Sequence, residues 1–117
     1  MHDTRIYNAD DGTSRFEDGE VSFASGPFAP PAPPVDVSPA EPMHDMVFIR
    51  LPSGWTDGAH PAPAQQWMFV LSGRGAITAG GETKHFGPGD AFLVEDTAAP
   101  GHASTAHEET VFAVVRR

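Results

Sequence analysis

The stretch of sequence that decides the fold is GWTDGAHPAPAQQWMFVLSG, which runs from Gly54 to Gly73. Its first half is rich in glycine, proline and polar residues, and it contains one histidine and two adjacent glutamines. Its second half holds the most hydrophobic run of the chain, Trp67 to Leu71. Glycine and proline exclude a helix from the first half, and a short apolar run between turn signals is typical of a core strand. The stretch therefore predicts a loop whose polar side chains lie at the mouth of a buried strand.

Glycine and proline interrupt the rest of the chain in the same way. The 117 residues include 12 glycines and 12 prolines, and no segment keeps a helical period. Strands are expected over residues 5–8, 20–23, 43–51, 67–71, 76–79, 82–86, 91–94 and 110–115. The strand over 43–51 is apolar on both faces, so we expect it to be buried on both sides. Many short strands at close spacing predict an all-β barrel or sandwich.

The first 42 residues differ from the remainder. We interpret residues 1–42 as an N-terminal arm with edge strands and a proline-rich strap, and residues 43–117 as the barrel. The strap is the segment 26–42, which holds seven of the 12 prolines. Proline fixes φ and lacks an N–H, which favours extended, unpaired backbone. We expect the strap to lie across the surface of a single domain.

Charge and composition exclude several kinds of partner. The 16 acidic and seven basic residues give a formal net charge of −9, and the basic residues are scattered, so nucleic acid is not an expected partner. The absence of cysteine excludes disulfides and thiolate chemistry. No basic segment followed by an apolar run begins the chain, and its longest apolar run is too short to span a membrane. We therefore expect a cytoplasmic protein with no membrane partner. A small barrel can host a ligand in its mouth, so the expected ligand is a small molecule.

The polar positions of the opening stretch resemble the first motif of the cupin family. Gly54, His60, Ala62, Gln66 and Gly73 stand where that motif has glycine, histidine, histidine, glutamate and glycine. The resemblance implies a cupin-like jelly-roll β-barrel of short antiparallel strands.

A looser counterpart of the second cupin motif follows. The Gly89-Asp90 turn, the strand over 91–94 and His102 resemble it. Glu95 replaces the usual proline, Thr97 replaces a glycine, and the histidine comes two residues late. The two motifs cover roughly half of the chain, from Gly54 to about residue 106.

The resemblance also implies a metal site, because cupins often hold one divalent metal on three histidines and a glutamate. Here His60, Gln66 and His102 match three of these positions, and Ala62 cannot act as a ligand. Zinc, iron, nickel, manganese or copper is the implied metal. A neutral amide is a poorer ligand than a carboxylate, so we expect weak metal binding, with a metal-free site as the alternative.

A substrate pocket is expected next to these residues. Its predicted lining is Trp55, Gln65, Trp67, Met68, Phe92 and Glu95. Neighbouring strand residues face opposite sides, so only one of Gln65 and Gln66 can point inward. The motif spacing selects Gln66, although a bulge at Pro63 would select Gln65. We expect Glu95 and Asp96 to belong to a solvated loop. In the alternative, one of them orients His102 or accepts a proton.

Three functions are compatible with these residues. The leading hypothesis is a small-molecule cupin enzyme with a divalent metal in the barrel mouth, performing lyase, isomerase or dioxygenase-type chemistry. The second is a metal-free isomerase or epimerase in which His60 and His102 carry protons as catalytic residues. The third is a non-catalytic binding module for a small ligand. The resemblance further implies a homodimer that pairs through N-terminal strands.

Overall fold

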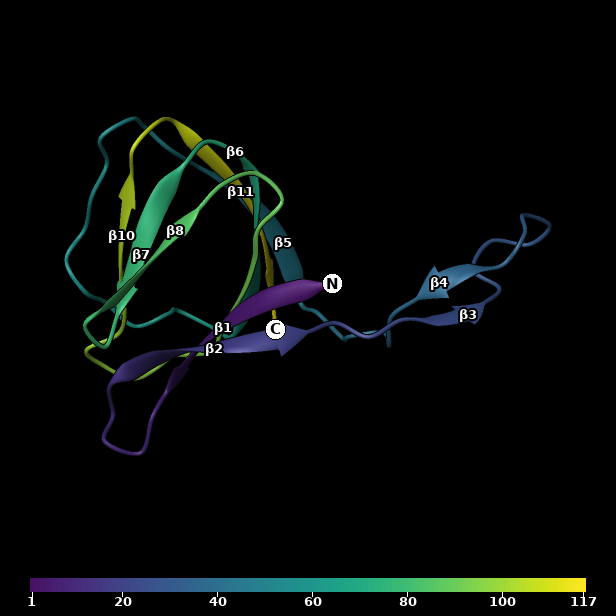
Figure 1. The fold of residues 1–117 in the computed structure, drawn as a ribbon, viewed down its shortest axis with the longest axis horizontal. Coiled ribbons are helices and arrows are strands. Elements are labelled where there is room, and N and C mark those ends of the chain that lie inside the picture. The colour runs from purple at the N-terminus through teal and green to yellow at the C-terminus, as the bar shows by residue number, and fades with distance from the viewer.

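The computed structural model describes every residue from Met1 to Arg117 and contains eleven strands and no helix (Figure 1). The strands are β1 His2–Asn8, β2 Ser14–Glu20, β3 Ala24–Gly26, β4 Val35–Val37, β5 Asp45–Leu51, β6 Gln66–Ser72, β7 Gly75–Ala79, β8 Glu82–Phe86, β9 Ala91–Val94, β10 Ala103–Ala106 and β11 Thr110–Arg116. No helix is therefore present that could cross a membrane.

Two sheets face each other and form the body of the molecule (Figure 1). The larger has six strands in the order β2-β1-β9-β6-β11-β5, and the smaller has the order β10-β7-β8. Neighbouring strands are antiparallel, except that β1 runs parallel to β9. No ladder joins the two sheets, so they are not hydrogen-bonded into a closed barrel. The predicted all-β jelly-roll fold is confirmed.

The core lies between the sheets and follows the alternation of strand side chains. On β6, Gln66, Met68 and Val70 face inward, while Trp67 and Phe69 face outward, where their rings stack. The centre of the core is aromatic: the ring centroid of Phe86 lies 5.3 Å from that of Phe112 and 6.3 Å from that of Phe92. Burying each such side chain stabilises the fold by about 1.5–3 kcal/mol.

The structure corrects the expectation that strand 43–51 is buried on both faces. This strand is β5, which pairs only with β11 and ends the large sheet. Met46 and Phe48 point outward and are 51% and 67% exposed. Ile49 and Leu51 point inward and are half-buried. The apolar pattern on both faces therefore belongs to an edge strand with one uncovered side.

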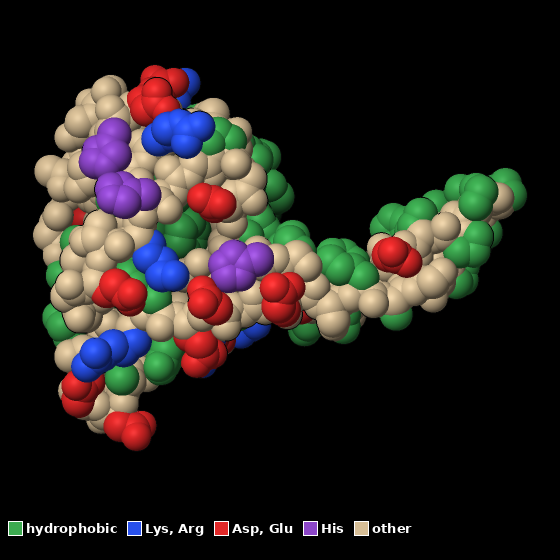
Figure 2. All heavy atoms as spheres, viewed as in Figure 1, with side chains coloured by type: hydrophobic (Ala, Val, Ile, Leu, Met, Phe, Trp, Pro, Cys, Tyr) green, Lys and Arg blue, Asp and Glu red, His purple; other side chains and the backbone are tan.

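The strap is also placed differently from the prediction. Its first part, with β4, pairs with β3 in a hairpin that extends away from the barrel and contributes to a long axis of 49 Å (Figures 1 and 2). Only its end lies on the barrel, where Glu41 accepts hydrogen bonds from Trp67 and Arg117. Hydrophobic side chains cover much of this hairpin in Figure 2. Phe28, at its tip, is 75% exposed. We call residues 23–37 the projecting arm.

Candidate functional site

The centre of the candidate site is a β-bridge between the loop before β6 and the start of β10. The backbone N–H of His60 donates to the carbonyl of His102 at 3.0 Å, and the reverse bond measures 3.1 Å. Directly opposed residues of an antiparallel pair project from the same face. The two imidazole centroids consequently lie 5.3 Å apart.

Gly101 makes this bridge geometrically feasible. Its φ is +82°, and a Cβ at this position would overlap the backbone carbonyl of His60. Only glycine adopts such a backbone at low cost and leaves room for the opposing strand. The glycine before His102 therefore determines how closely the two histidine backbones approach.

The ring of His102 forms a hydrogen bond with the buried carboxylate of Asp96. Its Nδ1 lies 2.7 Å from Oδ2 of Asp96, which also accepts a hydrogen bond from Ser14 Oγ at 2.7 Å. Asp96 is completely buried, and its second oxygen has no partner. Because a carboxylate only accepts, Nδ1 of His102 carries a hydrogen. In the neutral ring, Nε2 is then the basic nitrogen.

His60 has a different environment, in which both ring nitrogens face acceptors. Nδ1 lies 3.0 Å from the carbonyl of Pro61, and Nε2 lies 2.7 Å from Oδ2 of Asp57. Both nitrogens must donate to satisfy these contacts, which requires the imidazolium form. The Pro61 carbonyl raises the pKa of His60 most strongly; burial opposes this shift, and the Asp57 carboxylate adds to it. Oδ1 of Asp57 accepts the backbone N–H of Ser104 at 2.7 Å, which ties this pair to β10.

The two histidines border a cavity of about 390 Å³ between the sheets. Its walls are mainly apolar, and its polar lining includes the bridge residues His60 and His102 together with Asp57. The lining consists of Val47, Ile49, Leu51, Trp55, Asp57, His60, Pro63, Gln66, Met68, Ile77, His102, Ser104, Phe112, Val114 and Arg116. An apolar cavity with a few converging polar groups is the usual form of a small-molecule site.

Five of the residues predicted from the sequence meet around this cavity. They are His60, His102, Gln66, Trp55 and Met68. Gln66 is buried and faces inward, whereas Gln65 accepts a hydrogen bond from Arg117 on the outside of the barrel at 2.9 Å. No bulge at Pro63 reverses the two glutamines.

The structure corrects the placement of the other predicted pocket residues, of which Gln65 is one. Trp67 follows inward-facing Gln66 and so points to the outer face, where its indole N–H donates to Glu41. Phe92 packs edge-on against Phe86 within the core. The Glu95 carboxylate accepts from Arg5 at 2.6 Å and from Arg117 at 3.1 Å. These four side chains lie outside the cavity.

One residue of the site, Asp57, was not singled out by the sequence analysis; it precedes His60 by three residues in a turn-rich loop. Asp96 was considered both as part of a solvated loop and as a partner that orients His102, and the structure supports the second alternative. The signal for Asp96 was its position between β9 and His102. Its burial depends on Ser14 of β2 and on Ala62, whose N–H donates to the Asp96 carbonyl at 2.9 Å.

The donor set does not fit the implied metal centre. No three histidine, cysteine or carboxylate side chains are grouped so that they could hold an ion. Both nitrogens of His60 are engaged by acceptors, and Nδ1 of His102 is engaged by Asp96. A metal on these residues would require His60 to rotate away from Asp57 and Pro61.

Comparison with known proteins identifies the class. The Cupin domain family matches residues 47–116, which run from within β5 to the end of β11 and include both histidines. The chain therefore belongs to the cupin family. No curated protein matches it.

Solved structures agree with this assignment. A conserved protein of unknown function from Streptococcus pyogenes has 26% identity and a TM-score of 0.51 over 62% of each chain. A cupin superfamily protein from Desulfitobacterium hafniense DCB-2 has 11% identity and a TM-score of 0.51, over 66% of this chain and 81% of that one. An RmlC-like cupin from Shewanella frigidimarina NCIMB 400 has 14% identity and a TM-score of 0.50, over 97% and 82%. The chain thus spans less than two thirds of the S. pyogenes protein. At 11% and 14% identity, the similarity to the other two structures shows a shared fold only.

Proposed function

We propose that this cupin is a metal-independent enzyme that moves a proton on a small organic molecule, as in an isomerisation or epimerisation. The observation that carries the proposal is the pair of His–Asp couples, His102–Asp96 and His60–Asp57, opposed across one β-bridge at an apolar cavity. Aspartates that fix the orientation and protonation of an imidazole are characteristic of general acid–base sites.

His102 is the proposed base. Asp96 fixes the hydrogen on Nδ1, so Nε2 is the nitrogen available to take a proton from a substrate C–H bond. The electron pair of that bond moves onto an adjacent carbonyl and gives an enolate. Return of the proton to either face of the same carbon completes an epimerisation. Where that carbon carries a hydroxyl, the intermediate is an enediolate; a proton shift between its two oxygens and return of the proton to the former carbonyl carbon completes an isomerisation. Neither route needs an oxidant or reductant.

His60 is the proposed electrostatic partner. Its imidazolium is half exposed, so its ring can turn one N–H from the Pro61 carbonyl to a substrate oxygen. A charged donor near the enolate oxygen stabilises the transition state more than the ground state. The raised pKa of His60 keeps this charge present at a higher pH than in an unperturbed histidine.

The cavity restricts the substrate class. Its volume of about 390 Å³ lies near the lower end of the range for ligand sites. Apolar walls favour an alkyl or aromatic substituent, and the polar groups at the bridge favour a carbonyl or carboxylate. We therefore infer a small carbonyl acid with an acidic C–H bond.

Proton exchange in D₂O tests this proposal with phenylpyruvate and 2-oxohexanoate as probes. Proton NMR would follow deuterium uptake at C3 in the presence of a chelator. We expect exchange at least about 100-fold above the buffer rate, loss of that rate in His102→Gln, and retention in His85→Gln. Binding without exchange would support the non-catalytic module instead, and exchange unaffected by His102→Gln would contradict the role of His102.

We also propose that the chain forms a homodimer through the projecting arm. The arm exposes Phe23, Phe28 and Val35, and the edge strand β5 exposes Met46 and Phe48. A soluble monomer rarely leaves such apolar groups uncovered together. In a two-fold pair, the arm of each copy would cover the edge of the other.

A further inference from the structure

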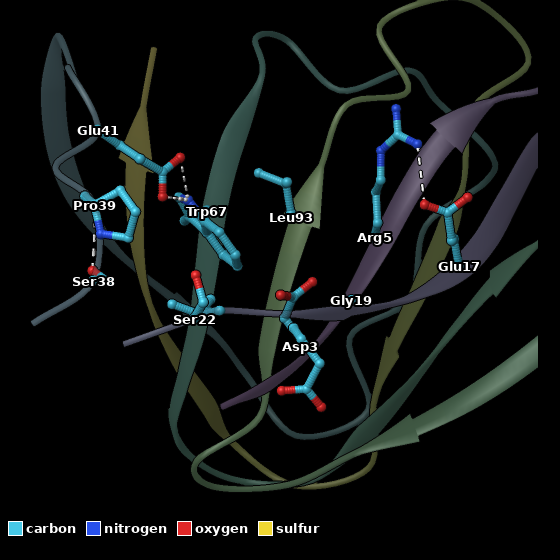
Figure 3. Close-up of a pocket in the computed structure, with 12 residues that line it drawn as sticks. Asp3, Arg5, Glu17, Gly19, Ser22, Ser38, Pro39, Glu41, Trp67 and Leu93 are labelled. Carbon is cyan, nitrogen blue, oxygen red and sulfur yellow. Dashed lines mark hydrogen bonds and ion pairs between the residues drawn. The ribbon is translucent and has the colours of Figure 1, made fainter. Parts of the chain in front are cut away.

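A second hollow lies on the outer face of the large sheet, beneath the chain that returns from the projecting arm (Figure 3). Its volume is about 340 Å³. Trp67 forms part of its wall, while the neighbouring Gln66 and Met68 line the cavity on the other side of the same strand. We call this hollow the outer groove, and it is separate from the site of the two histidines.

The register of four strands builds the outer groove. Asp3 of β1 lies opposite Gly19 of β2, and Arg5 lies two residues further along β1 on the same face. Arg5 is opposite Leu93 of β9, which is opposite Trp67 of β6. A row of polar groups at one end thus continues into an apolar floor at the other.

Most charged groups of the outer groove are already paired. Arg5 contacts Glu17 at 3.3 Å and Glu95 at 2.6 Å. Glu41 accepts from the Trp67 indole and from Arg117. These pairs leave little charge free to attract a ligand.

Asp3 is the exception. Its residue surface is only 6% exposed, yet its carboxylate makes no hydrogen bond and no ion pair within the chain. Gly19 leaves the space that the carboxylate occupies, since a Cβ there would overlap Asp3 Oδ1. The Asp3 oxygens are not fully enclosed, so the carboxylate meets solvent only through the groove that it lines, and this partial burial disfavours its charge. Burial correspondingly raises the pKa of Asp3.

We propose that the outer groove binds a small organic cation, with an ammonium head at Asp3 and an apolar stem along Leu93 and Trp67. An ammonium group supplies the ion pair and hydrogen bonds that Asp3 lacks. The apolar floor then covers the stem. The formal net charge of −9 also favours the approach of cations over anions.

A titration with n-hexylammonium chloride tests the proposal, with n-hexanol as the neutral probe. In a ¹H–¹⁵N spectrum of the full chain, we expect saturable shifts at Asp3, Gly19 and the Trp67 indole N–H. The Trp55 indole, which belongs to the histidine cavity, should not move. Hexanol should bind at least about tenfold more weakly, which corresponds to about 1.4 kcal/mol.

Three variants decide the role of Asp3. Asp3→Asn should weaken hexylammonium binding by about tenfold or more. Gly19→Ala should also weaken hexylammonium binding, because the added methyl group displaces the Asp3 carboxylate. With two independent variants, the test remains decisive if one of them fails to fold. Glu109→Gln removes the same charge from an exposed site and should leave binding unchanged. Equal weakening by Asp3→Asn and Glu109→Gln would indicate diffuse attraction, and equal binding of hexanol would indicate apolar contact alone; either result would overturn the proposal.

Discussion

At the scale of single residues, the two histidines that face each other in the β-bridge carry different proton arrangements because their partners differ. Asp96 approaches His102 from the buried side and engages one ring nitrogen, whereas Asp57 and the Pro61 carbonyl engage both nitrogens of His60. The chemistry proposed for the cavity depends on this difference. His102 offers an unprotonated Nε2 that can accept a proton, and His60 offers a positively charged imidazolium.

Asp57→Asn should lower the pKa of His60, because the variant removes a carboxylate that raises it. The Pro61 carbonyl remains, so part of the shift should persist. Titration of the His60 ring proton by NMR measures the change. Asp36→Asn on the projecting arm is the matched control, and an equal shift in that variant would contradict the local assignment.

The same contact makes stability depend on pH. A histidine whose pKa is raised on folding stabilises the fold fully below its unfolded pKa of about 6.5, and this contribution is lost as pH rises through the folded pKa. Asp57→Asn should therefore destabilise the protein more at pH 5.5 than at pH 8.5. Urea unfolding at both pH values measures this, and an equal loss at both would contradict the pairing.

Asp96→Asn should reduce proton exchange by about 100-fold or more, because the amide can present N–H to His102 and favour the wrong tautomer. We also expect a loss of about 1–3 kcal/mol of stability from the disturbed buried hydrogen bonds with Ser14 and His102. Exchange rates and urea unfolding of the variant measure the two effects. Normal exchange in a folded variant would show that Asp96 is only structural.

At the scale of elements, the bridge between the loop and β10 brings the two halves of the site together. Gly101→Ala should weaken it, because a methyl group would overlap the His60 carbonyl and the residue would be strained at positive φ. We expect a loss of about 2 kcal/mol or more, measured by urea unfolding. Gly58→Ala, where an added Cβ meets no atom, is the control and should cost much less.

The elements also show what the sequence could predict. Strands β6 to β9 and β11 were expected near their actual positions because apolar runs between glycine turns leave few alternatives. β10 was missed, since Ala103–Ala106 is small and polar and becomes a strand only by pairing with β7. β5 was assigned two buried faces because a sequence pattern does not reveal which strand ends a sheet.

The site was predictable to a similar extent. The motif spacing identified His60, Gln66 and His102, which line one cavity, because a fixed spacing on a β-framework fixes which side chains converge. Trp67 and Phe92 were misplaced, since an aromatic residue near a site is equally suited to the core or the outer face. The two aspartate partners depend on loops that come together only in the folded chain.

At the scale of the whole molecule, the projecting arm leaves its apolar surface uncovered in a single copy. Phe28→Ser should shift a homodimer toward monomer, because it removes an exposed aromatic group from the proposed interface. Light scattering coupled to gel filtration measures the mass. Leu71→Ser, which alters an exposed residue of the barrel, should leave the dimer intact; a monomeric wild type would contradict the interface.

The central claim is that His60 and His102 form one small-molecule site within the barrel. NMR of all six histidine rings during a phenylpyruvate titration tests it most directly, because the other four provide internal controls. The account predicts saturable shifts of the His60 and His102 rings, with His2, His44, His85 and His107 unchanged. Saturable binding that leaves the rings of His60 and His102 unmoved would contradict it.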